Sequence, residues 1–203
     1  MARAVFFSFH YQRDIHRVQV VKQHHMTKGT YTAAGFFDGS LEEKSKREGD
    51  GAVKALIDRG LNGASVTCVL MGAETYQRRW VDYEVLKSVE LGMGVFGIRI
   101  HNIPDMTKSS STSQGKDSPG SNVFEFLGYR YNSQKFQPVI NYSGEWTDAP
   151  YQSEISSPKA LYLKNQSSAV NLSSIFRIYD WASDNGYANF PQWVEAAAKQ
   201  AGR

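Results

Sequence analysis

The sequence contains one cysteine, Cys68, and only a small excess of positive charge. A lone cysteine excludes a disulfide within the chain, and its position in an apolar run predicts a reduced, buried thiol rather than a nucleophile. The formal net charge of +3 is small for a nucleic-acid-binding protein, which usually concentrates more Lys and Arg on one face. We therefore expect no disulfide and no nucleic-acid partner, whereas the charge does not oppose an anionic nucleotide.

The sequence also lacks long apolar runs. No stretch approaches the ~18 apolar residues that span a bilayer, and the run at residues 4–9 is too short for a signal peptide. We therefore expect a cytoplasmic protein that does not enter a membrane. The 203 residues, of which 41% are hydrophobic, suffice for a single domain over residues 1–203 with a sizeable core.

Common catalytic and metal-binding motifs are missing as well, including G-x-S-x-G, H-E-x-x-H, Cys-x-x-Cys and the Walker loop. The run from Gly92 to Gly97 has the spacing of a dinucleotide fingerprint. That fingerprint needs a strand before the glycines and a helix after them, and here the order is reversed, so Gly92 is interpreted as a helix stop. His24 and His25 are adjacent on a predicted helix and point about 100° apart, so we expect no metal site.

Strand and helix patterns alternate through the first half of the chain. Four short apolar runs are typical of strands buried on both faces. They cover residues 4–9, 33–37, 66–71 and 95–100. Three intervening stretches carry helical patterns, with apolar side chains at helical spacing. They cover residues 13–25, 41–59 and 78–91. Strands separated by helices predict an α/β fold with a parallel sheet.

The second half has a different pattern. Residues 104–122 are rich in Ser, Thr, Gly and Lys, which predicts a mobile loop. Residues 124–150 predict a small antiparallel β-ribbon insertion, with a tight turn at Ser143-Gly144. Residues 171–201 are expected to form C-terminal helices, the second of which starts at Asn189 with Pro191. The first of these helices is predicted from the apolar residues Leu172, Ile175, Phe176 and Tyr179.

Residues 78–84 are the strongest functional signal, because they open a helix just beyond the carboxyl end of the strand at 66–71. Ligands gather at that edge of open α/β sheets. Trp80 and Glu84 are four residues apart and share one helix face. An aromatic plane beside a carboxylate suits a flat cationic ring and positive charge formed on its sugar. The alternative is a core tryptophan with a solvated glutamate nearby, and spacing alone does not exclude it.

Three segments fall at carboxyl ends of successive predicted strands, namely Ser8–Tyr11, Phe37–Ser40 and Arg79–Glu84. Together they resemble a bacterial TIR domain, and in particular the TIR-like subunit of Thoeris antiphage systems. The residues that carry the resemblance are Val5–Gln12, Ala33–Asp38, Gly60–Leu70, Arg78–Glu84 and Tyr179–Trp181.

The resemblance implies a flavodoxin-like parallel sheet of about five strands. It implies an enzyme of the NAD glycohydrolase or ADP-ribosyl cyclase type, for which NAD is a substrate and no resident cofactor is needed. Such proteins cleave the nicotinamide–ribose bond after phage infection and release a cyclic ADP-ribose isomer, which activates a sirtuin-like NADase effector. A phage-derived trigger and self-association are compatible with it.

The resemblance also implies roles for individual residues. Glu84 falls at the position of the catalytic glutamate. The loop after the first strand contributes to the nucleotide pocket, and it is formed here by Ser8, Phe9, His10 and Tyr11. Because of their placement at the same sheet edge, we expect Asp38 and Trp80 to contact NAD.

Two other functional classes stay open from the sequence. One is a TIR-type scaffold that binds partners and does no chemistry, since a fold does not fix a function. The other is a flavodoxin-like protein that binds a flavin or a nucleotide. The residues at the sheet edge favour NAD cleavage, because an ionised carboxylate there would stabilise the charge that develops on the ribose as neutral nicotinamide leaves.

Overall fold

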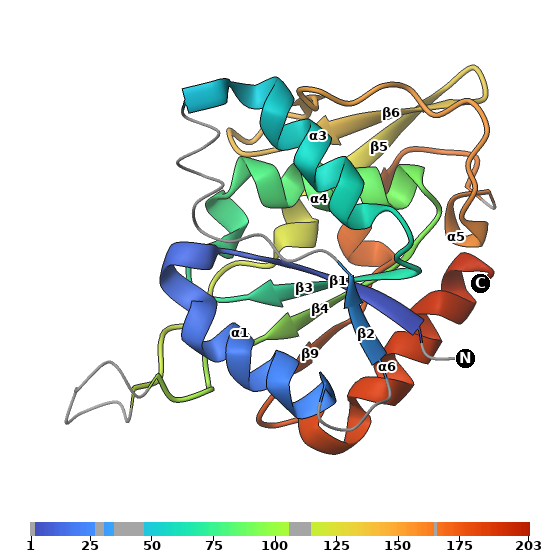
Figure 1. The fold of residues 1–203 in the computed structure, drawn as a ribbon. Coiled ribbons are helices and arrows are strands. Elements are labelled where there is room, and N and C mark those ends of the chain that lie inside the picture. The colour runs from blue at the N-terminus through green and yellow to red at the C-terminus, as the bar shows by residue number, and fades with distance from the viewer. Residues whose placement is uncertain (1–2, 27–30, 35–46, 106–114, 165) are drawn as a thin grey trace.

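The computed structural model describes residues 3–26, 31–34, 47–105, 115–164 and 166–203, and two sheets organise them (Figure 1). The first sheet has five strands in the order β2-β1-β3-β4-β9, and all neighbouring pairs are parallel. Its strands are β1 (Arg3–Phe9), β2 (Tyr31–Ala34), β3 (Val66–Met71), β4 (Gly94–Arg99) and β9 (Ile178–Asp180). The predicted α/β class with a parallel sheet of about five strands is confirmed.

Helices cover both faces of this sheet (Figure 1). They are α1 (Tyr11–Met26), α3 (Asp50–Leu61), α4 (Arg79–Glu90) and α6 (Gly186–Ala201). Shorter helical segments are η1 (Thr75–Gln77), η2 (Val123–Phe126), α5 (Leu161–Lys164) and η3 (Leu172–Ser174). Among the described segments, no helix combines the length and the apolar composition that crossing a membrane requires.

Side chains that alternate along β1 show how the layers form. Val5 and Phe7 face α1 and α6, where they join a core with Val18 and Phe190, whereas Phe6 faces α3 and packs with Ile57. This alternation follows from the period of two along a strand. Because both faces are covered, β3 is buried along its whole length and β1 over Val5–Ser8, as expected for a parallel sheet.

The second sheet lies beyond α4 and is antiparallel, with the strand order β7-β6-β5-β8 (Figure 1). Its strands are β5 (Leu127–Asn132), β6 (Lys135–Ile140), β7 (Thr147–Asp148) and β8 (Val170–Asn171). Helix α4 therefore lies between two sheets. Its apolar residues Val81, Val85 and Val89 join a core with Leu127 and Tyr129 of β5.

The predicted ribbon at 124–150 forms, but its tight turn is elsewhere. The turn between β5 and β6 has left-handed residues at Ser133 (φ 46°) and Gln134 (φ 69°), the conformation that a two-residue hairpin turn requires. The expected turn at Ser143-Gly144 is instead part of a six-residue connection, because Ile140 pairs with Thr147.

The predicted helix over Leu172–Tyr179 is wrong. Only the turn η3 forms, and the chain then extends into β9, whose Tyr179 pairs with Ile98 on the free edge of β4. The Arg177 carbonyl accepts a hydrogen bond from the Gly97 amide at 2.9 Å. Tyr179 stacks on Trp193 of α6 with ring centroids 4.2 Å apart. The helical spacing of the apolar residues was outweighed by these sheet hydrogen bonds and ring contacts.

Helix α6 starts earlier than predicted, at Gly186, so Pro191 lies inside it. Proline has no amide proton, and the Tyr187 carbonyl four residues earlier therefore loses its helical donor. His24 Nε2 lies 3.0 Å from that carbonyl oxygen. This contact gives His24 a structural role. Gly92 ends α4 with φ of 70°, and the Met93 amide bonds to the Ser88 carbonyl, so its interpretation as a helix stop is confirmed.

The loop prediction for residues 104–122 is only partly testable, since residues 106–114 lie outside the described ranges. Residues 115–122 do not behave as a mobile loop. The Gly115 carbonyl accepts hydrogen bonds from the Asp105 amide at 3.0 Å and from buried Arg17 at 2.9 Å. Asp117 forms an ion pair with Arg13 at 3.0 Å. The polar composition was mistaken for disorder, whereas these polar groups bind the partly exposed Arg13 and the buried Arg17 on α1.

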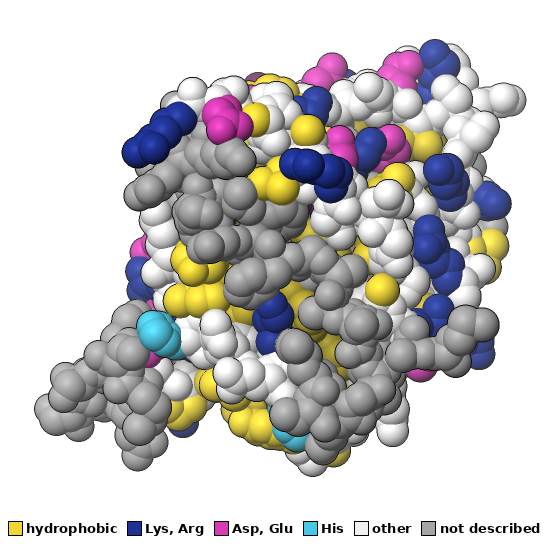
Figure 2. Space-filling view, viewed as in Figure 1, with side chains coloured by type: hydrophobic (Ala, Val, Ile, Leu, Met, Phe, Trp, Pro, Cys, Tyr) yellow, Lys and Arg dark blue, Asp and Glu magenta, His cyan; other side chains and the backbone are white. Residues whose placement is uncertain are grey.

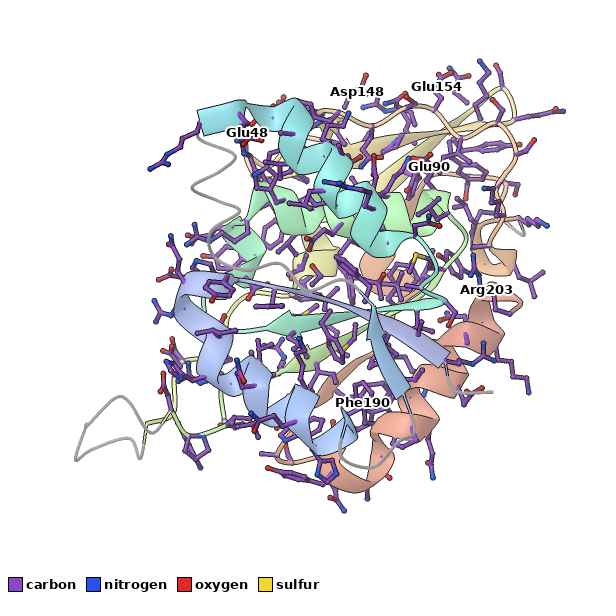
Figure 3. All side chains as sticks on the ribbon, in the orientation of Figure 1. Glu48, Glu90, Asp148, Glu154, Phe190 and Arg203 are labelled. Atoms are coloured by element: carbon purple, nitrogen blue, oxygen red, sulfur yellow. The ribbon has the colours of Figure 1, made fainter. Side chains whose placement is uncertain are left out.

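We expect Asp117→Asn to lower the free energy of unfolding by about 1–3 kcal/mol, because it removes a charged acceptor from Arg13 and from the buried Arg17. Thermal melting would show this as a shift of about 2–4 °C per kcal/mol. The matched control is Asp148→Asn, which disrupts the exposed pair with Arg130 on the second sheet and should change stability little (Figure 3). Equal melting temperatures for Asp117→Asn and the unmodified chain would contradict the structural role of Asp117.

Candidate functional site

The candidate site lies where the carboxyl ends of β1 and β3 meet the first turns of α1 and α4. Ser8 of β1 pairs with Val69 of β3 in register, so these strands end side by side. The carboxyl ends of parallel strands form one edge of the sheet, and ligands bind there in open α/β folds. The predicted segments Ser8–Tyr11 and Arg79–Glu84 are both at this edge.

A hydrogen bond joins the two segments inside the protein. The Ser8 hydroxyl donates to Glu84 Oε2 at 2.5 Å, and both side chains are buried. Burial raises the pKa of Glu84 to about 8, and the hydrogen bond from Ser8 acts in the opposite direction. At neutral pH the Glu84 carboxyl therefore mostly holds its proton in this conformation.

Two hydroxyl groups connect α4 to β3 one helical turn after Glu84. Ser88 donates to the Glu84 carbonyl at 2.6 Å, and its hydroxyl lies 2.7 Å from that of Thr67 on β3. All three residues are buried. These contacts hold the turn that carries Glu84 against the sheet. Sequence reasoning did not identify Thr67 and Ser88, although a serine inside a helix can bond the carbonyl four residues earlier whatever residue is there.

His10 follows β1 directly and is only 3% exposed. Burial lowers its pKa to about 4, with smaller effects of nearby Arg78 and Arg13 in the same direction and of Glu74 against them. His10 is therefore neutral at physiological pH. The rings of Phe9 and Tyr11 lie 6.3 Å apart on either side of it in sequence. Ser8, His10 and Glu84 are thus all buried at the same edge of the parallel sheet.

Trp80 lies in a different environment from the one expected. Its ring stacks on Tyr151 at 5.8 Å, meets the edge of Tyr83 at 6.0 Å, and carries the Arg79 guanidinium 4.8 Å above it. Glu84, in contrast, is buried and not solvated. The alternative of a solvated glutamate is therefore wrong, whereas the interpretation of the pair as a site for a flat cationic ring stays a prediction. The predicted residue Asp38 lies outside the described ranges, and the NAD contacts expected of Asp38 and Trp80 stay predictions.

A second buried carboxyl lies on α4, on the side away from Glu84. Burial raises the pKa of Asp82 to about 7. Its two oxygens lie 2.8 and 2.9 Å from the Tyr142 hydroxyl, which is also 2.7 Å from the Tyr76 carbonyl. One hydroxyl proton cannot serve both acceptors. A protonated Asp82 can donate to Tyr142 while Tyr142 donates to Tyr76, so the three groups anchor the second sheet to α4.

Most acidic side chains on the face in Figure 2 lie over α3 and the second sheet, among Lys and Arg. Four of these acidic residues are labelled in Figure 3: Glu48, Glu90, Asp148 and Glu154. Within the ranges that the structure describes, no three His, Cys, Asp or Glu side chains are grouped as a metal site requires.

Comparison with known proteins agrees with the geometry. The family described as "Thoeris protein ThsB, TIR-like domain" matches residues 6–105. A protein of Bacillus cereus (strain MSX-D12), "Putative cyclic ADP-D-ribose synthase ThsB1", is 44% identical over 201 residues, which are 96% of this chain and 100% of the relative. The chain belongs to the ThsB family. The resemblance to the Thoeris TIR-like subunit is thereby confirmed, and the ThsB match includes Ser8, His10, Arg78 and Glu84.

The raised pKa of Glu84 predicts a pH-dependent effect of Glu84→Gln on stability. Because the folded protein retains the Glu84 proton and the unfolded chain releases it, the wild type loses stability as pH rises from about 4.5 to about 8. Glutamine does not titrate. We therefore expect the melting temperature of Glu84→Gln, relative to wild type, to rise between pH 5 and pH 8.5 by at least about 2–4 °C, the shift that 1 kcal/mol produces.

The matched control is Glu90→Gln on the same helix, where the carboxylate pairs with Lys87 at 2.7 Å near the surface. Its melting-temperature difference from wild type should not grow over this pH range. A constant difference for Glu84→Gln as well would show that Glu84 is already ionised in the folded protein.

Proposed function

We propose that this ThsB protein cleaves NAD at the nicotinamide–ribose bond and closes the remaining ADP-ribose into a cyclic isomer during antiphage defence. The observation that carries the proposal is the buried Glu84, held by Ser8 at the ligand-binding edge of the sheet. The name of the Bacillus relative, "Putative cyclic ADP-D-ribose synthase ThsB1", supports the same chemistry.

The charge of the substrate suits this site. The nicotinamide ring of NAD is cationic and leaves as a neutral molecule, so positive charge passes to the ribose in the transition state. An ionised carboxylate beside that ribose stabilises the charge and needs no partner acid, since the leaving group takes no proton. A cationic ring beside Glu84 would lower the raised pKa of this carboxyl and favour its ionised form. Oxidised NAD would thereby create the catalytic charge that its own cleavage requires.

Cyclisation requires an internal nucleophile, either a ribose hydroxyl or an adenine nitrogen, to react before water does. Ser8, His10 and Glu84 are all less than a tenth exposed, which suits a site that excludes solvent. Burial of an ionisable carboxyl lowers stability at neutral pH. Unlike Asp82, which anchors the second sheet, Glu84 is buried at the ligand-binding edge of the parallel sheet, so catalysis is the better explanation of its burial.

We also propose that the cyclic nucleotide diffuses to a sirtuin-like NADase effector, and that infection supplies the trigger. The resemblance to Thoeris systems supports both steps.

Glu84→Gln should abolish the signal without unfolding the protein, because glutamine keeps the size of the side chain and removes its charge. Loss of such a stabiliser lowers a rate by about 10²–10³-fold. Cyclic ADP-ribose species are measured by mass spectrometry of infected cells. Small-molecule filtrates of the same cells are added to the purified effector. Wild-type filtrate should activate it, and Glu84→Gln filtrate should not.

Glu90→Gln serves again as the matched control and should produce the signal at the wild-type level. Wild-type amounts of cyclic product from Glu84→Gln cells would show that Glu84 is not catalytic. If activation of the effector instead needs the protein retained above the filter, the result would support the scaffold function and contradict the proposal of a diffusible signal.

A further inference from the structure

Two side chains at the same sheet edge carry buried nitrogen atoms with no hydrogen-bond partner. They are His10, at Nδ1 and Nε2, and Arg78, at Nε; within the described residues none of these atoms has a hydrogen-bond partner, and the neutral imidazole offers one N–H donor and one acceptor nitrogen. A buried donor left unsatisfied destabilises a protein by about 1–3 kcal/mol. Such groups in a native protein call for an explanation, and a ligand that supplies acceptors is one.

These two residues are close enough to interact. Arg78 is the charge with the largest effect on the pKa of His10. His10 lies between β1 and α1, and Arg78 is the N-cap residue of α4, two turns before Glu84. Both therefore belong to the edge that holds Ser8 and Glu84.

Nearby carboxylates bind Arg78 less closely than they bind Arg13 on α1. Arg13 is engaged by two carboxylates, Glu74 and Asp117, through direct hydrogen bonds. Arg78 has only a looser contact with Glu74, at 3.6 Å. Glu74 is thus shared between the two arginines and holds Arg13 more closely, so the Arg78 guanidinium next to His10 is the less tightly paired of the two.

The start of α4 adds further donors. Arg78 as N-cap makes no side-chain hydrogen bond to the first turn of the helix. The first amide groups of a helix lack partners within it and carry partial positive charge, which favours an anion. Helix amides, a guanidinium and a neutral imidazole here converge on one edge, and all of them can donate to an anion.

We propose that His10 and Arg78, with the first turn of α4, form a subsite for the diphosphate of the dinucleotide. The inference rests on the proposed function and assigns the substrate's anionic centre. A diphosphate has only acceptors to offer, and a guanidinium binds phosphate oxygens through paired N–H groups. With the diphosphate at this end of α4, the nicotinamide ribose extends along the edge toward Glu84, two turns further on.

The subsite is tested by isothermal titration calorimetry of ADP-ribose binding to Glu84→Gln protein, in which turnover is blocked. Adding Arg78→Gln should weaken ADP-ribose binding by about 10–100-fold, as expected for lost hydrogen bonds to a charged group. Nicotinamide riboside, which has no diphosphate, should bind equally to both proteins. Adding Arg130→Gln instead removes the same charge from an exposed ion pair on the second sheet and should change neither affinity.

A second variant and a second readout keep the test independent of folding. Arg78→Lys retains the positive charge but loses the paired N–H groups of the guanidinium. The affinity of this variant for ADP-ribose should therefore fall between those of the parent protein and of Arg78→Gln. An anion beside His10 raises the pKa of its imidazole, against the influence of Arg78 and Arg13. Binding near pH 5.5 should therefore take up protons, measured as heats that differ between buffers of different ionisation enthalpy.

Equal ADP-ribose affinities with and without Arg78→Gln and Arg78→Lys, or no binding of ADP-ribose by the parent protein, would overturn the subsite. The proposed function is judged separately by the cyclic product in infected cells. Loss of that product in Glu84→Gln cells, together with unchanged ADP-ribose binding by Arg78→Gln, would discard the subsite alone.

Discussion

The hydrogen bond from Ser8 to Glu84 places an ionisable group in the interior, and much of the surrounding structure serves to hold it there. It links the carboxyl end of strand β1 to the second turn of α4. A carboxyl group buried in this way destabilises the fold as pH rises through its pKa, so the neighbouring elements must hold α4 in place. The distribution of contacts around α4 shows how they do so.

Helix α4 is restrained on two sides. Toward the parallel sheet, its valines pack on β3 and β4, and Ser88 contacts Thr67. Toward the second sheet, Tyr129 donates to the Leu86 carbonyl at 3.1 Å and Tyr142 bonds to Asp82. The β-insertion therefore holds the helix that carries Glu84 in place. Held from both sides, α4 keeps Glu84 against Ser8 with little freedom to turn toward solvent.

The sequence predicted the parts of the molecule that local patterns determine. The strand at 66–71 agrees residue for residue with β3, because an apolar run between glycine-containing turns has few alternatives. The alternation of strands and helices also placed Ser8–Tyr11 and Glu84 at one edge. Contacts between residues that are distant in the sequence were not predicted. Tyr151, for example, stacks on Trp80 from 71 positions away, and no local spacing reveals this contact.

Other errors have the same origin. Tyr179 was assigned to a helix because apolar spacing says nothing about the free edge of β4, which recruits it into a strand. Asp117 was assigned to a mobile loop because composition does not show the buried Arg17 that its segment contacts. The sequence placed His10 in the predicted nucleotide loop and Arg78 at the start of a predicted helix, but only the three-dimensional arrangement shows that their buried nitrogen atoms have no partner within the described residues.

The central claim is that Glu84 acts as a carboxylate whose ionisation Ser8 controls. The most direct measurement is the pH dependence of nicotinamide release from NAD by the infection-activated protein, compared between wild type and Ser8→Ala. Loss of the Ser8 hydrogen bond removes the contact that lowers the pKa of Glu84, so the midpoint of the rise in rate should move to higher pH. A midpoint that stays in place, or moves to lower pH, would contradict the account.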